Sequence, residues 1–358
     1  MSGSEGEGRF GAARRSALLE ELRQTRSRRT PSDRPAARPG PKPQPKAFDF
    51  GALPGHKQIR LQKSAAEMLG IGVPYFREQE GYAGPTCFIE GREVLNFSSY
   101  NYLGLNGHPK VHAAARDAID RYGVSVSASR VVAGERDLHA KLEKGLASFY
   151  GTEDCVTMVS GHATNMTTIG ALMGPKDVIL TDTWIHNSIT EGARLSGAAR
   201  VTFPHNDLDW LDDFLSRNRG RYDRALIVVE GLYSMDGDWP DLPRLVELKH
   251  RHDAWLMVDE AHAVGVLGET GRGIAEMQGV DPASVEIWMG TLSKTFSSCG
   301  GYICGSAALI EFLKANAAGF VFSVGLAAPL AAAALASLEV LQAEPERVSR
   351  LQANGRRL

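Results

Sequence analysis

The sequence predicts an α/β protein whose core is a mostly parallel, seven-stranded sheet flanked by helices. Two observations favour this fold class. Short apolar runs alternate with helical stretches along the chain, and this alternation is typical of parallel strands joined by helical crossovers. Several of the apolar runs also end in polar side chains, and ligands bind where the strands of such a sheet end. We therefore expect a binding crevice at the carboxyl edge of the sheet.

The first elements are marked by turn and capping residues. A small hairpin is predicted over Thr86–Phe97, with its turn at Glu90-Gly91. A helix is predicted over His108–Tyr122, because Pro109 falls in its first turn and Gly123 follows its last residue.

A second helix is predicted over Asp137–Tyr150, where leucines recur at helical spacing and Gly151 stops the pattern. An Ala/Leu-rich helix is predicted over Ala327–Leu341. The seven predicted strands are Asp154–Val159, Val178–Thr181, Ala199–Phe203, Arg224–Glu230, Ala254–Asp259, Glu286–Gly290 and Gly301–Gly305.

Composition narrows the class of protein. The 358 residues are 43% hydrophobic, which is enough for a substantial core. The net charge of −2 gives no indication of nucleic-acid binding. No apolar run approaches the roughly 20 residues of a membrane span, and the N-terminus lacks the apolar segment of a secretory signal. The four cysteines lack CxxC spacing, so we expect free thiols, no metal site and a cytoplasmic location.

The chain is expected to divide into four regions. Residues 1–46 contain eleven Lys/Arg against five Asp/Glu, with much Pro and Gly, and they should form a disordered basic tail. A short amphipathic helix at Ser16–Arg23 is an option within it, and early glutamates argue against a mitochondrial transit peptide. Residues 47–98 would form an N-terminal arm with the hairpin, 99–326 a large cofactor-binding domain, and 327–358 the start of a further domain.

The most informative residues are a lysine and an aspartate at two strand ends. Lys294 follows the strand that begins the run Trp288–Phe296, and Asp259 ends the strand before His262. Pyridoxal phosphate (PLP) requires a lysine that forms a Schiff base and a carboxylate that keeps its ring nitrogen protonated. Taken alone, the pair is also compatible with a surface lysine and a helix-capping aspartate.

Further polar residues follow the same strands. The run Ser160–Asn165 comes between a strand and a helix, and the N–H groups of a helix start bind phosphate well. Thr291 lies three residues before Lys294 and can add a hydroxyl to a phosphate. Each signal is weak alone, because any strand-to-helix turn favours small polar residues.

Two histidines and a serine complete the candidate site. His186, in Thr181–Ser188, can stack on a flat pyridine ring, although an isolated histidine is more often a cap or a core residue. His262 lies three residues beyond Asp259 and can reach the phenolic oxygen of the same ring. Ser234, in Glu230–Asp238, can point at the cofactor or belong to an ordinary Asp-Gly turn.

Taken together and in their order along the chain, these sequence runs resemble those of the α-oxoamine synthases, PLP enzymes of the fold-type I aminotransferase superfamily. The resemblance covers roughly residues 90–350. It includes serine palmitoyltransferases, 8-amino-7-oxononanoate synthases and members found beside polyketide assembly systems. The runs that carry it are Asn96–Leu105, Ser160–Asn165, His186–Ser188, Glu230–Asp238, Val258–His262, Gly265–Gly273 and Gly290–Phe296.

The resemblance implies a role for each residue. Lys294 would bind PLP and then act as general acid and base at the substrate Cα, while Asp259 would hold the ring nitrogen protonated. His186 would stack on the ring, and His262 and Ser234 would contact its phenolic oxygen. The residues implied to hold the phosphate are Gly161, His162 and Thr291.

The family activity implied is a decarboxylative condensation of a small α-amino acid with an acyl thioester, which yields an α-amino ketone, CO₂ and a free thiol. Delivery of the acyl group by coenzyme A or by an acyl carrier protein stays open, and the basic tail would suit an acidic carrier. A homodimer is expected, as is a small C-terminal domain that is truncated at Leu358. The alternatives are another fold-type I PLP enzyme, such as an aminotransferase, and a non-catalytic partner subunit.

Overall fold

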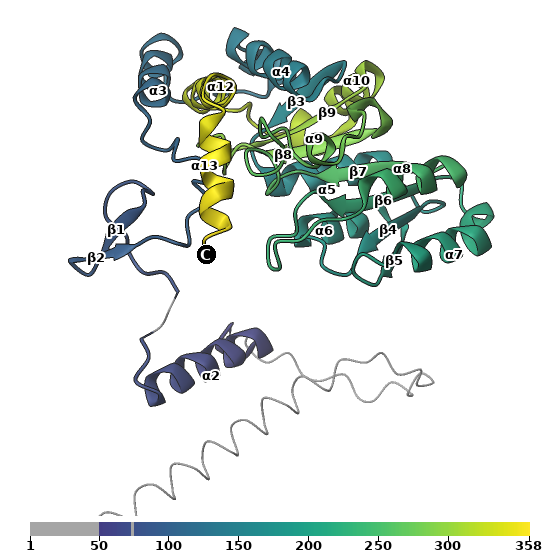
Figure 1. The fold of residues 1–358 in the computed structure, drawn as a ribbon, viewed down its shortest axis with the longest axis horizontal. Coiled ribbons are helices and arrows are strands. Elements are labelled where there is room, and N and C mark those ends of the chain that lie inside the picture. The colour runs from purple at the N-terminus through teal and green to yellow at the C-terminus, as the bar shows by residue number, and fades with distance from the viewer. Residues whose placement is uncertain (1–49, 73–74) are drawn as a thin grey trace, which may run out of the picture. The chain divides into compact units, whose positions relative to one another are not determined.

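The computed structural model describes residues 50–72 and 75–358 (Figure 1). They fall into two compact units, of which the first ends at Phe76 and the second spans Arg77–Leu358. Within the first unit, the described residues form η1 (Phe50–Ala52) and α2 (Pro54–Met68). The predicted basic tail and its optional helix lie outside the described residues.

The second unit is built on the predicted seven-stranded sheet. Its strands lie in the order β3-β9-β8-β7-β6-β4-β5. β9 runs antiparallel to both of its neighbours, and the other strands are parallel to one another. All seven predicted runs are strands: β3 (Asp154–Met158), β4 (Val178–Asp182), β5 (Ala199–Phe203), β6 (Ala225–Glu230), β7 (Trp255–Asp259), β8 (Ile287–Thr291) and β9 (Gly301–Gly305).

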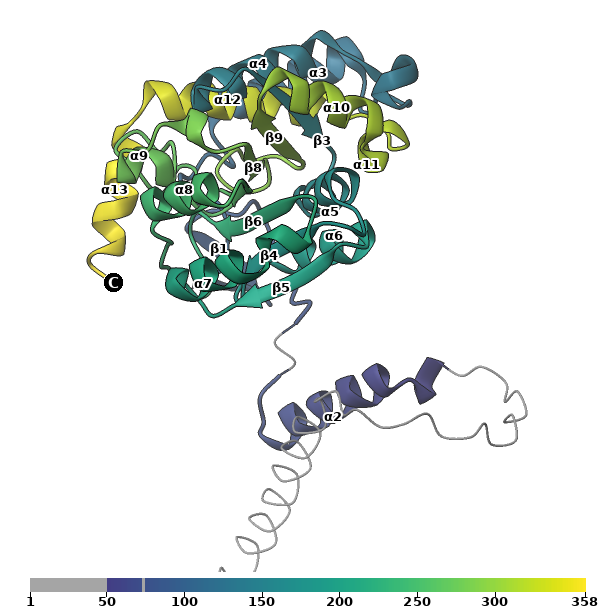
Figure 2. The same ribbon diagram turned by 90° about the vertical axis from the view of Figure 1, so that its right-hand side faces the viewer.

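Helices cover both faces of the sheet (Figures 1 and 2). They are α3 (Pro109–Tyr122), α4 (Asp137–Tyr150), α5 (Gly161–Leu172), α6 (Asn187–Ser196), α7 (Leu208–Asn218), α8 (Leu242–Arg251), α9 (Ile274–Gln278), α10 (Ala307–Asn316), α11 (Ala318–Val321), α12 (Ala328–Ala343) and α13 (Glu346–Gly355). Shorter turns are η2 (Arg130–Gly134), η3 (Arg219–Arg221) and η4 (Pro282–Ser284). None of the helices in the described part of the chain has the length and hydrophobicity to cross a membrane.

The period of two along each strand separates two core clusters. Val178 and Leu180 of β4 belong to the core cluster that includes residues of α4, α7, α8, α9, α12 and α13, whereas Ile179 belongs to the cluster that includes residues of α5, α6, α10 and α11. Every residue of β4 is buried, because helices cover the sheet on both sides. This explains why the central strands are almost continuously apolar in the sequence.

The predicted N-terminal elements are also confirmed. β1 (Thr86–Ile89) and β2 (Arg92–Leu95) form an antiparallel hairpin with the turn at the predicted position. α3 is capped by the His108 side chain, and α4 ends at Gly151, whose positive φ of 73° is a left-handed conformation that suits glycine.

α12 belongs to the body of the second unit. It lies beside α3 and α4 (Figure 2), and small residues allow the close approach, since a Cβ on Gly145 would lie 3.1 Å from Leu338. Ala333 and Ala336 pack against Val111 of α3. The predicted domain boundary before residue 327 stays a prediction.

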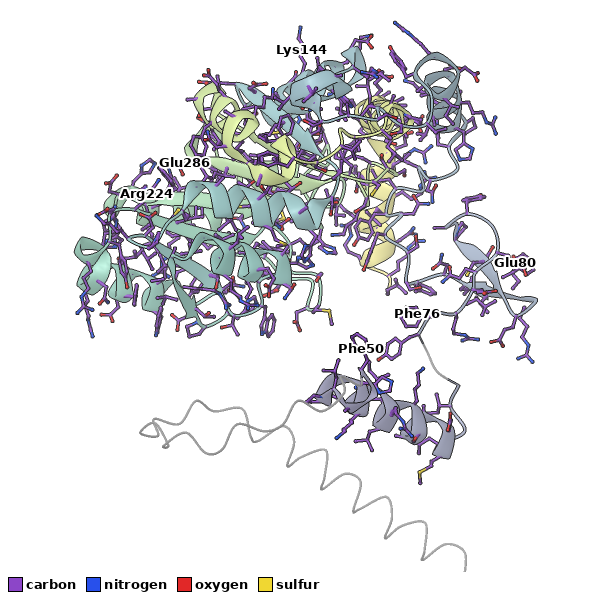
Figure 3. The ribbon with its side chains drawn as sticks, turned by 180° about the vertical axis from the view of Figure 1, so that it is seen from behind. Phe50, Phe76, Glu80, Lys144, Arg224 and Glu286 are labelled. Carbon is purple, nitrogen blue, oxygen red and sulfur yellow. The ribbon has the colours of Figure 1, made fainter. Side chains whose placement is uncertain are left out.

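The two edges of the sheet differ in character. At the amino edge, a cavity of about 530 Å³ opens between Arg224, just before β6, and Glu286, just before β8 (Figure 3). None of the predicted site residues lines this cavity. They lie instead at the carboxyl edge, where Glu230, Asp259 and Thr291 end neighbouring parallel strands.

Candidate active site

Lys294 and His262 meet at the carboxyl edge of the sheet. The Lys294 Nζ lies 2.8 Å from Nε2 of His262, although 32 residues separate them in the sequence. The other ring nitrogen of His262 lies 2.8 Å from the hydroxyl of Tyr102. The lysine is also 5.5 Å from the centre of the Tyr100 ring. The predicted lysine and histidine therefore share one site, and two tyrosines border it.

Burial sets the ionisation of these groups. Burial lowers the pKa of Lys294, although Asp259 and Glu230 partly oppose this by stabilising its ammonium form. Burial also lowers the pKa of His262 to about 4, with a further contribution from Lys294. His262 is therefore neutral at pH 7, and one of its nitrogens can donate a hydrogen bond while the other accepts one.

The loop that carries Lys294 is fixed at its base by two antiparallel strands. Thr291 ends β8 opposite Gly301, which begins β9. The Leu292 N–H donates to the Gly300 carbonyl at 2.9 Å, and the Ser298 N–H donates to the Leu292 carbonyl at 2.9 Å. The backbone around Lys294 is thus closed into a short hairpin loop.

Asp259 is buried and held from two sides. Asp259 is the last residue of β7, and it is 5% exposed. The Asn165 side-chain amide donates to Oδ2 at 2.8 Å, and the Ala261 N–H donates to Oδ1 at 3.0 Å. A carboxylate in this position can stabilise a cationic ring nitrogen, because its orientation is set before a ligand arrives.

A chain of hydrogen bonds connects Asp259 to His186. Asn165 also donates to Ser188 Oγ at 2.9 Å, and this hydroxyl lies 2.7 Å from His186 Nδ1. His186 also caps α6 by accepting from the Ser188 N–H, which is the structural role considered for this histidine in the sequence. Burial lowers the pKa of His186 below its ordinary value, which favours the neutral imidazole.

The predicted phosphate site lies at the start of α5. Ser160 caps this helix by accepting from the Ala163 N–H, and the first helical residue, Gly161, lies against Thr291. A Cβ on Gly161 would lie 2.7 Å from Thr291 Oγ1, so a larger residue would not fit. The Thr291 hydroxyl lies 2.8 Å from Ser293 Oγ. N–H groups and hydroxyls at a helix N-terminus suit an anion.

Two predicted residues are less closely connected. His162 is exposed, and its ring centre lies 6.0 Å from that of His186. Ser234 is exposed in the turn after β6, and no hydrogen bond among the described residues joins it to Lys294 or His262. The roles of both residues stay predictions.

Sequence reasoning missed the supporting residues. Asn165 and Ser188 stood within runs that were singled out, but no role was predicted for them, and Tyr102 and Ser293 were likewise left without one. For Asn165, Ser188 and Ser293 the signal was position, since each lies within a few residues of a predicted ligand, whereas Tyr102 lies far from all of them in the sequence. The donor set fits PLP: an amine, a buried carboxylate, imidazoles and an anion-binding helix start. Fold and site together define a PLP enzyme of fold type I.

Comparisons with known proteins agree with this class. The family model for aminotransferase class I and II matches residues 92–358. The 8-amino-7-oxononanoate synthase of Geobacter sulfurreducens is 46% identical over 265 residues, which cover 74% of this chain and 67% of the relative. The chain belongs to the α-oxoamine synthases, PLP-dependent acyltransferases of the class I and II aminotransferase family.

Solved structures show the same relationship. Serine palmitoyltransferase from Sphingomonas wittichii superposes with a TM-score of 0.82 at 33% identity, over 87% of this chain and 77% of that protein. An 8-amino-7-oxononanoate synthase from Francisella tularensis superposes with a TM-score of 0.63 at 28% identity, over 72% of each chain.

Proposed function

We propose that this protein condenses a small α-amino acid with an acyl thioester, with loss of CO₂, to form an α-amino ketone. The observation that carries the proposal is the position of Lys294, whose amine lies 2.8 Å from His262 at the carboxyl edge of the sheet, where the buried Asp259 ends β7. The names of the related proteins support a condensing rather than an amino-transferring enzyme.

Each residue has a distinct task in this proposal. Lys294 takes the proton from the substrate Cα and later returns one, and its lowered pKa makes the neutral amine more accessible near pH 7. Asp259 would maintain a positive charge on the ring nitrogen, and His262 would donate a hydrogen bond to the phenolic oxygen. When bound, PLP supplies the conjugated ring that accepts carbanion charge.

The remaining residues orient the cofactor. His186 would stack on the ring, and Ser234 would add a contact to the phenolic oxygen. Gly161, His162 and Thr291 would hold the phosphate at the start of α5. All of these residues already lie at the carboxyl edge of the sheet.

The test is a visible absorption spectrum of the purified chain with added PLP, beside a Lys294→Ala variant. We expect an absorption band from lysine-bound PLP in the parent chain and none in the variant. Glycine, alanine and serine are then titrated, and the amino acid that shifts the band is the substrate. Release of CO₂ and thiol from an added acyl-CoA would support condensation, whereas oxo-acid-dependent amino transfer would contradict it.

We further propose a homodimer, with acyl groups delivered by an acyl carrier protein, in the cytoplasm. The support for carrier delivery is the excess of six positive charges in residues 1–46, since carrier proteins are acidic. Sedimentation equilibrium of the PLP-bound protein tests the dimer. A monomeric mass for the PLP-bound protein would contradict it.

A further inference from the structure

A histidine outside the predicted site lies between two carboxylates. His205 follows β5, and its Nδ1 lies 2.9 Å from Asp182 Oδ1, while its Nε2 lies 2.8 Å from Asp238 Oδ2. We refer to these three residues as the His205 bridge. Asp182 ends β4 and Asp238 lies in the loop after β6, so the bridge joins three neighbouring strand ends.

The geometry favours a charged imidazole. Ionised carboxylates only accept hydrogen bonds, so His205 can donate to both Asp182 and Asp238 only when each of its nitrogens carries hydrogen. The ring is also enclosed by aromatic side chains, since Trp184 stacks on it at 3.9 Å and Tyr233 meets it edge-on at 4.7 Å. Its side chain is 18% exposed, and that of Asp182 is fully buried.

The partners of the bridge hold the two loops on either side. Asp182 accepts the Trp184 N–H at 2.8 Å and the Asn206 N–H at 2.9 Å. The Asn206 side-chain amide donates to Asp238 Oδ2 at 3.1 Å. The loop after β4, which contains Trp184, leads to His186 within a few residues. The loop after β6, which contains Asp238, also contains Ser234.

We propose that His205, as an imidazolium, is a positioning residue that ties the loop after β4 to the loop after β6 and so holds His186 and Ser234 in place for the cofactor. The last part rests on the proposed function, whereas the tie between the loops does not. No hydrogen bond or ring contact among the described residues joins His205 to Lys294 or Asp259, and it acts through the backbone of the two loops.

The ionisable groups around the ring support its charge. Burial alone would disfavour the imidazolium, but hydrogen bonds and charge from Asp182 and Asp238 raise the pKa of His205 above its ordinary value. The other titratable group against the ring is Tyr233, whose pKa burial raises, so it stays neutral. Glu230, at the end of β6, has a pKa that burial raises to about 8, and the charge of Asp182 contributes to that rise.

The first test is hydrogen exchange of the full chain without cofactor. We compare His205→Gln and Asp238→Asn with the parent. Asp238 is 44% exposed, so its variant should fold even if the other does not. We expect the amides of Trp184, Tyr233 and Gly237, which are hydrogen-bonded within the loops, to exchange about tenfold faster in both variants.

A matched control is His252→Gln. His252 also pairs with a carboxylate, since its Nε2 lies 2.6 Å from Asp212, but it follows α8 on another part of the surface. This variant should leave exchange in both loops unchanged. Parent-like exchange in the folded bridge variants would overturn the proposed tie.

The second test is a PLP titration of the same proteins followed by absorbance. We expect the dissociation constant to rise about tenfold in both bridge variants and to stay unchanged in the control. Faster exchange with unchanged PLP affinity would overturn the positioning role. If the parent itself bound no PLP, the proposed function would fail, while the exchange result would still decide the tie.

Discussion

Asn165 donates a hydrogen bond from its side-chain amide to Asp259 Oδ2, 2.8 Å away and 94 residues later in the sequence. Both residues are buried, at 1% and 5% exposed. The same amide group reaches Ser188, and through it His186. One side chain thus connects the carboxylate that we propose for the ring nitrogen with the imidazole that we propose for the ring face.

The Asn165→Ala variant should therefore lose activity without losing PLP. Removing a hydrogen bond to a charged group costs about 1.5–3 kcal/mol, so kcat/KM for CO₂ release should fall about tenfold to hundredfold. The control is Asn218→Ala, because Asn218 donates to a backbone carbonyl at the exposed end of α7. Equal rates in the two variants would show that Asn165 does not orient Asp259.

The Lys294→Met variant without cofactor should be more stable than the parent at pH 7. Burial lowers the pKa of Lys294 from its model-compound value of 10.5, so the folded state disfavours the ammonium form. This penalty is present below the lowered pKa and fades as pH rises to 10.5. Urea unfolding at pH 7 and at pH 10.5 measures it, and a gain that grows with pH would contradict the buried amine.

The Glu260→Gln variant should flatten the pH dependence of stability. Glu260 is 1% exposed and accepts the Ile274 N–H, and burial raises its pKa from 4.5 to about 8. The parent should therefore lose stability as pH rises from 4.5 to 8, by about 1.4 kcal/mol per pH unit from this group. The free energy of unfolding of the variant should not fall over this pH range. If it falls equally in both proteins, a group other than Glu260 causes the pH dependence.

Deleting residues 1–46 should weaken the use of acyl carrier protein but not of acyl-CoA. The segment holds eleven Lys/Arg against five Asp/Glu, and attraction to an acidic carrier should weaken further as salt rises. A full-length variant with these eleven residues changed to Gln separates charge from length. Equal losses with both acyl donors would remove the docking role.

Much of the fold could be predicted because its signals are local. Each strand is a short apolar run, and α4 shows leucines at helical spacing with a terminal glycine. The direction of β9 was not predicted, since Gly301–Gly305 has the same apolar pattern as the parallel strands. Loop length carried the missing signal, because the segment between β8 and β9 is too short for a parallel crossover.

The site could be predicted only in part. Lys294, Asp259 and His262 stand at strand ends, where the fold class brings ligands together. The contacts of Asn165 with Asp259 and of Tyr102 with His262 join residues 94 and 160 positions apart, and no local pattern indicates such pairs. The His205 bridge escaped prediction for the same reason.

The hairpin between β8 and β9 has a consequence for how the lysine moves. Hydrogen bonds join Leu292 to both Gly300 and Ser298, so the two ends of the loop are held close together. In the proposed mechanism, Lys294 would therefore carry its amine from one substrate atom to another by rotation about its side-chain bonds, while the base of the loop stays paired.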